Sequence, residues 1–221
     1  MIILWDKSKL YVSMGVIVLT LLFGIIPFCL YLYKRQKGIY CDKAYLGIVL
    51  LFFIASLYET IASLILKINV LVWFQVYSLL EFIALFYLFI NLLNRKPKAY
   101  FYLSLGLFVI VYLFSFRFLT NHHFLVSKTI NKVFVMIFVI VSSFIVINQN
   151  FIQKTSLRLF KRADFYMVIG LLVYYSVTIP LFVLCSYRVD NKLYFLDYWL
   201  INILGSLTLR IVISIGIWKI K

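Results

Sequence analysis

The sequence predicts an all-α, polytopic membrane protein, built as a bundle of about seven transmembrane helices. Hydrophobic residues make up 65% of the 221 residues and mean hydropathy is +1.06, whereas soluble domains are roughly 45–50% apolar. Charged residues account for only 13%, against roughly 25% in soluble domains, and most lie between long apolar runs. Spans and short loops consume almost the whole chain, so we expect residues 1–221 to form a single integral membrane domain.

Seven apolar runs give the expected spans in chain order. They cover approximately residues 12–32, 44–66, 70–93, 100–116, 130–147, 165–184 and 193–218. The first run follows two lysines, as in a signal peptide, but it exceeds the ~7–15 residues of a signal-peptide core. Lys34 and Arg35 follow it in place of a small-residue cleavage site, so we interpret it as a retained first helix. The fourth and fifth runs are the shortest, near the lower limit of ~17 residues for a span.

The second and third runs are joined only by Lys67, Ile68 and Asn69, which predicts a tight transmembrane hairpin. Each of these runs carries one carboxylate, Glu59 in the second and Glu81 in the third. An acid inside hydrocarbon is costly and usually marks a functional interior. The hairpin is therefore where we expect the polar interior of the bundle.

Helical spacing arranges further polar residues around these two acids. Tyr77 precedes Glu81 by four residues, so the two side chains share a face of the third run. Gln75 lies about as far below the connector as Glu59 does, judged at ~1.5 Å of rise per residue. We therefore expect the side chains of Glu59 and Gln75 to meet.

The seventh run supplies a polar stripe of its own. Asn202, Ser206 and Arg210 stand at positions i, i+4 and i+8, and the adjacent Gly205 permits close approach of a neighbouring helix. Arg210 is the only cation well inside an expected span. Because buried ions require partners, we expect Arg210 to pair with an acid, and Glu81 lies at a reachable depth.

Together these residues predict a polar intramembrane site for a small ligand or a proton. Its expected members are Glu59, Gln75, Tyr77, Glu81, Asn202 and Arg210. The alternative is that they only hold the helices together, since interhelical polar contacts contribute ~0.6 kcal/mol each on average. The sequence leaves both interpretations open.

Catalytic and metal-binding motifs are missing from the sequence. It contains no H-E-x-x-H, G-x-S-x-G, P-loop or kinase signature. The three cysteines, Cys29, Cys41 and Cys185, show no spacing typical of a disulfide framework or a zinc site. We therefore expect no catalytic residue, no metal and no cofactor.

The net charge of +15 is unevenly distributed. Thirteen Lys and Arg residues fall on one side of the predicted bundle and eight on the other, so the positive-inside rule predicts an outside N-terminus and a cytoplasmic C-terminus. We expect a multi-pass protein of a bacterial inner membrane. Its basic loops would attract anionic headgroups and contact a cytoplasmic protein partner, such as a signalling kinase. Because the charges sort by side, this interpretation is favoured over nucleic-acid binding.

Four stretches carry a resemblance to known sequences. They are Tyr58-Glu59-Thr60, Phe74-Gln75-Val76-Tyr77-Ser78-Leu79-Leu80-Glu81, Ile169-Gly170-Leu171-Leu172-Val173-Tyr174-Tyr175-Ser176, and Trp199 to Asn202. In these the chain resembles a family of mostly uncharacterised seven-helix membrane proteins common in Bacteroidota. His is usual in that family where Gln75 stands, which weighs against proton relay at this position. The resemblance implies an integral-membrane sensor or accessory protein.

The leading hypothesis is a non-enzymatic membrane protein of sensor, receptor or accessory type. A second is an oligomeric pore or accessory effector of a bacterial defence system of the CRISPR type. A third is an intramembrane enzyme that modifies lipid with the two glutamates as acid and base. Whether the chain forms an oligomer is left open by the sequence.

Overall fold

The computed structural model describes residues 2–61, 71–93, 97–118, 124–152, 163–187 and 192–220. Over these ranges the chain is helical and contains no strand, which confirms the all-α prediction. The helices are α1 (Ile2–Gln36), α2 (Lys43–Tyr58), α3 (Leu71–Leu92), α4 (Lys98–Ser115), α5 (Phe124–Val146), α6 (Ala163–Tyr187) and α7 (Lys192–Trp218). A short 3₁₀ turn, η2 (Phe116–Phe118), follows α4, and a π turn, η3 (Ile147–Ile152), follows α5.

All seven helices contain a segment long and apolar enough to cross a membrane. These segments are Met14–Gln36, Lys43–Ile61, Gln75–Leu92, Lys98–Ser115, Thr129–Gln149, Ala163–Leu181 and Leu200–Trp218. They follow the seven predicted runs in order, and the two short runs both form complete helices. The predicted connector Lys67–Asn69 lies outside the described residues. The chain is therefore a multi-pass membrane protein with a seven-helix bundle.

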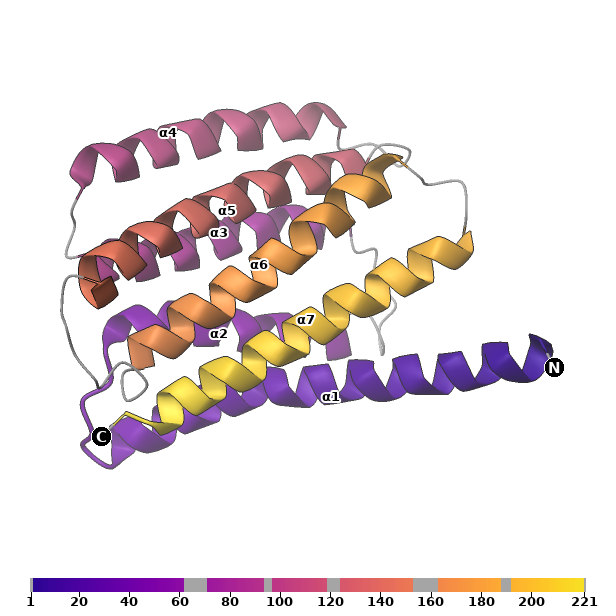
Figure 1. Ribbon diagram of the computed structural model, residues 1–221, viewed down its shortest axis with the longest axis horizontal. Coiled ribbons are helices and arrows are strands. Elements are labelled where there is room, and N and C mark those ends of the chain that lie inside the picture. Colours follow the sequence, from indigo (N-terminus) through magenta and orange to yellow (C-terminus); the bar gives the residue numbers. More distant parts are fainter. Residues whose placement is uncertain are drawn as a thin grey trace.

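Six of the helices form a closed ring, and the remaining helix, α4, packs outside it (Figure 1). Around the ring each helix contacts the next in the order α1, α2, α3, α5, α6, α7, and α7 returns to α1. Helix α4 packs on α5 and touches α3, at the edge of the bundle away from α1. Side chains on the inner faces of α2, α3, α6 and α7 can therefore meet in the middle.

One end of the bundle, which we call the basic end, gathers described Lys and Arg residues. Helix α1 stops there because Gly38 adopts φ +73° and Ile39 N–H bonds back to the Lys34 carbonyl. The Lys34 Nζ also donates to the Ile220 carbonyl at 2.8 Å and lies 5.3 Å from the Trp218 ring centroid. These contacts join the ends of α1 and α7, near the C-terminus in Figure 1. The opposite end, where α2 ends and α3 begins, is the distal end.

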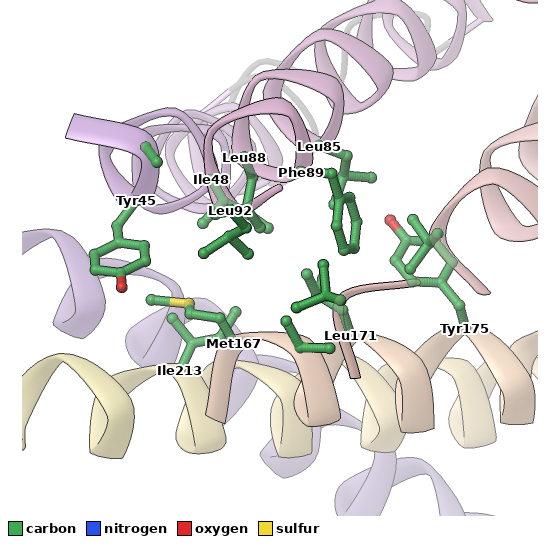
Figure 2. Close-up of a cluster of buried hydrophobic side chains, with 14 of the residues drawn as sticks. Tyr45, Ile48, Leu85, Leu88, Phe89, Leu92, Met167, Leu171, Tyr175 and Ile213 are labelled. Atoms are coloured by element: carbon green, nitrogen blue, oxygen red, sulfur yellow. The ribbon is translucent and has the colours of Figure 1, made fainter. Parts of the chain in front are cut away.

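Between the centre and the basic end the ring is filled with hydrocarbon (Figure 2). Side chains from four helices converge there, and all are at most 1% exposed. We call this group the apolar plug: Ile48, Leu85, Leu88, Phe89, Met167, Leu171 and Ile213. Helix α4 is held separately by an aromatic stack of Phe82 and Phe108, whose ring centroids are 3.8 Å apart.

Candidate functional site

A buried ion pair lies inside the ring just beyond the apolar plug. Glu81 of α3 contacts Lys132 of α5, with 2.5 Å between Lys132 Nζ and Glu81 Oε1. Tyr175 of α6 donates its hydroxyl to the same carboxylate oxygen at 2.7 Å. Glu81, Lys132 and Tyr175 are 3%, 6% and 2% exposed. Burial removes water from both charged groups, so only close ion-pair contacts and hydrogen bonds can offset the lost hydration energy.

Aromatic side chains complete the surroundings of this pair. The Lys132 ammonium lies 5.0 Å from the Tyr175 ring centroid and 5.7 Å from that of Tyr174, within the range of a cation–π interaction. Tyr77, one turn before Glu81 on α3, interacts electrostatically with it. We call Tyr77, Glu81, Lys132, Tyr174 and Tyr175 the charged site.

A small cavity adjoins the charged site. The volume open to the centre of a water molecule is about 10 Å³, which is close to what one water requires. Tyr77, Glu81, Tyr174, Tyr175 and Ser206 line its polar wall, and apolar side chains of α2, α3, α6 and α7 line the rest. The second carboxylate oxygen, Glu81 Oε2, is buried without a hydrogen-bond partner among the described residues. A buried acceptor left unused beside a water-sized space is suited to bind water.

Arg210 does not make the expected pair with Glu81. Its Nη1 donates to the backbone carbonyl of Thr20 on α1 and to Ser56 Oγ on α2, the latter at 3.2 Å. The guanidinium carbon lies 5.7 Å from the Phe52 ring centroid. Lys132 of α5 occupies the position next to Glu81, so the expectation that Arg210 pairs with Glu81 was wrong.

Gln75 belongs to a different polar group, on the outer side of α3. Its amide nitrogen donates to Ser115 Oγ at 2.6 Å, and its amide oxygen accepts from Ser127 Oγ at 3.3 Å and Asn131 Nδ2 at 3.2 Å. Asn131 also donates to Ser115 at 2.9 Å. We call these four residues the amide cluster. Gln75 thus bonds to α4 and α5, whereas the sequence predicted contact with Glu59 of α2.

Glu59 is exposed, not buried as its place in an apolar run predicted. It caps the end of α2, with its N–H bonded to the carbonyls of Ala55 and Ser56. It interacts electrostatically with Tyr77 and Tyr174 of the charged site, and Arg210 interacts with both tyrosines as well. Glu59 and Arg210 are therefore neighbours of the charged site and not its centre.

Asn202 reaches the charged site through a tyrosine. Asn202 Oδ1 accepts a hydrogen bond from the Tyr174 hydroxyl at 3.4 Å. Gly205 allows this approach, because a Cβ there would come within 3.3 Å of the Tyr174 ring. Of the six predicted site residues, Tyr77 and Glu81 line the cavity, Asn202, Arg210 and Glu59 surround it, and Gln75 lies apart.

Sequence reasoning missed three members of the charged site. Lys132 was counted among the loop charges when the orientation was predicted, although the predicted fifth run, residues 130–147, already contains it. Tyr174 and Tyr175 look like ordinary aromatic residues of a span. Their adjacency is the available signal, since neighbouring residues on a helix point about 100° apart and can flank one ligand.

Comparison with protein-family models, with characterised proteins and with solved structures finds no match. Among the described residues no three His, Cys, Asp or Glu side chains gather in a way that could hold a metal ion. What the site offers chemically is a carboxylate and three phenols that line a space for one water, with an ammonium paired to the carboxylate. This set of groups can bind, hold and release a proton.

Proposed function

We propose that this protein is a non-enzymatic membrane protein of sensor or accessory type that responds to protons. Proton binding at Glu81 is the event to which it responds. One observation carries the proposal: Glu81 Oε1 is shared by Lys132 and Tyr175, while Oε2 has no partner among the described residues and the residue lines a cavity for one water. A cavity this small favours a proton over an organic ligand.

The response follows from the loss of one charge. When Glu81 takes up a proton, the ion pair disappears and a buried Lys132 ammonium is left without its counter-charge. An uncompensated buried charge is strongly unfavourable, so α5 and α6 must repack around Lys132 or Lys132 must lose its proton. Because Glu81, Lys132 and Tyr175 lie on three different helices, proton binding is coupled to the packing of α3, α5 and α6.

The proposal includes an orientation in a bacterial inner membrane. Lys132 is buried in α5, so it does not count among loop charges, and the asymmetry predicted from the sequence becomes thirteen loop Lys and Arg on the side of the C-terminus against seven on the other. By the positive-inside rule the basic end is cytoplasmic and the N-terminus is outside. A cytoplasmic partner would bind at the basic end.

Infrared difference spectroscopy on the protein in lipid nanodiscs tests the proton site. On acidification we expect a C=O stretching band of a protonated carboxyl group that is missing in Glu81→Gln. Its intensity should be retained in Glu59→Gln, which is the matched control because Glu59 is the other glutamate of the same hairpin. Identical difference spectra for the wild type and Glu81→Gln would overturn the proposal.

A further inference from the structure

We infer that protons reach Glu81 from the distal end of the bundle alone, through an entrance marked by Glu59. The inference rests on the proposed proton site and adds the side of the membrane that the site samples. It is drawn from a gradient of exposure along α2, α3 and α7, combined with the position of the apolar plug.

The gradient is clearest on α2. Glu59 follows the end of α2 in a π turn and is close enough to Tyr77 and Tyr174 to interact with both, so it lies on the side of α2 that faces the charged site. Ala55 and Ser56 are 2% and 1% exposed, yet Glu59 is exposed. Because Glu59 is exposed and interacts with Tyr77 and Tyr174, the charged site lies close to the protein surface on this side.

Helices α3 and α7 show the same trend toward the distal end. On α3, Glu81 is buried and Tyr77, one turn nearer the distal end, is half-buried. On α7, Arg210 is buried while Ser206 and Asn202 are half-buried. On α6 the half-buried Tyr174 bonds to Asn202, which adds a polar wall from a third direction. Polar groups therefore lead from the distal surface toward the cavity.

The path is closed on the other side. Below the cavity Ile48, Leu85 and Leu171 are each 1% exposed, and the plug continues through Phe89 and Ile213 at 0%. From Glu81 to Leu92, at the end of α3, the distance is roughly 16 Å at ~1.5 Å per residue. Apolar cavities and packed hydrocarbon exclude water, so the part of the chain that the structure describes offers a proton no hydrogen-bonded route from the basic end.

The charged and titratable groups around Glu81 come from four helices. Lys132 on α5 and Tyr175 on α6 bond to it, and Tyr77 on α3 and Tyr174 on α6 interact with it electrostatically. Arg210 on α7 and Glu59 after α2 interact with Tyr77 and Tyr174. Two of the six are cations, and both lie deeper in the bundle than Glu59. Among the described residues Glu59 is an acidic group on the distal side of the charged site, so it attracts cations and protons from the distal solution.

The test separates the pH on the two sides of the membrane. The protein is placed in sealed vesicles with one orientation, which is checked by labelling the exposed Lys43 of the basic end with an impermeant amine reagent. The pH is then lowered on one side at a time, while a buffered interior fixes the other. The readout is the carboxyl band assigned by its loss in Glu81→Gln. Glu59→Gln is measured in parallel, since it removes the entrance charge and leaves the site.

We expect the band to follow distal-side pH only, and to grow more slowly in Glu59→Gln. A band that follows basic-end pH, or either side equally, would overturn the inference while leaving the proton site in place. A Glu59→Gln variant with unchanged kinetics would overturn the part assigned to Glu59. A band absent under all conditions, including acidification of both sides, would instead overturn the proposed function.

Discussion

Helix α3 contributes residues to two polar groups, the amide cluster and the charged site, and these differ in charge, hydrogen bonding and the space beside them. The amide cluster around Gln75 is neutral, and its members mainly bond one another across α3, α4 and α5. The charged site around Glu81 holds an ion pair, an unused carboxylate oxygen and a cavity. Gln75 and Glu81 are six residues apart, which turns them to different faces of the helix.

The difference shows that polarity inside a membrane protein has two uses. The amide cluster joins α4, which packs outside the ring, to α3 and α5, so it serves as interhelical attachment. The charged site lies between ring helices that already pack on one another. Its ions carry a desolvation cost that a neutral core would avoid, so its presence calls for a function. Each prediction below tests this contrast.

The largest effect is expected from Lys132→Met. The substitution leaves the Glu81 carboxylate buried without its counter-charge, and breaking a buried pair in this way costs about 3–5 kcal/mol. We expect the free energy of unfolding in lipid nanodiscs to fall by this amount. The exposed Lys98 at the start of α4 provides the matched control, because Lys98→Met removes the same charge without uncovering a buried partner.

A second variant identifies the cause of that loss. The double substitution Glu81→Gln with Lys132→Met removes both charges, so we expect most of the lost stability to return. A double variant as unstable as Lys132→Met alone would mean that Lys132 acts through packing. The charged site would then be attachment of the same kind as the amide cluster.

Helices α3 and α7 show which features of the fold could be predicted from the sequence. The length of the apolar runs predicted the seven spans, because a helix satisfies its own backbone hydrogen bonds inside lipid. Helical spacing also placed Tyr77 with Glu81, and Asn202 with Ser206 and Arg210, on common faces. These are local relations, and local geometry determines them.

Local helical spacing could not predict which residues of different helices contact one another. Depth alone made Arg210 a partner for Glu81, but the choice between Arg210 and Lys132 depends on which helices are neighbours. In this fold α5 adjoins α3, and Arg210 of α7 turns toward α1 and α2. Ring order is a property of the whole bundle, so no single run of residues encodes it.

Arg210 lies between the two extremes, because it is charged but its described partners are neutral. A close approach of α1 is required, since a Cβ on Gly24 would lie 2.9 Å from both Arg210 Nη1 and Ser56 Cβ. We therefore expect Gly24→Ala to separate α1 from α2 and cost about 1–3 kcal/mol, as overpacking does. Thermal unfolding in nanodiscs measures the loss.

Gly15 on the same helix is the matched control for Gly24. A Cβ at Gly15 would meet nothing within 4 Å, and alanine is the better helix former by about 1 kcal/mol. We expect Gly15→Ala to leave stability unchanged or slightly raised. An equal loss in both variants would show that α1 tolerates no added methyl group, and that closeness to Arg210 is not the cause.

A smaller effect than that of Lys132→Met is expected from Gln75→Met, which removes the amide and keeps the side-chain length. The Asn131–Ser115 hydrogen bond at 2.9 Å does not involve Gln75, so the cluster keeps one of its links. The three hydrogen bonds of the Gln75 amide are lost, and interhelical hydrogen bonds in membranes contribute ~0.6 kcal/mol each on average, so we expect a loss of about 2 kcal/mol in the same unfolding assay. The carboxyl band of Glu81 should be unchanged. A loss as large as that of Lys132→Met, or an altered band, would mean that the two groups on α3 act as one.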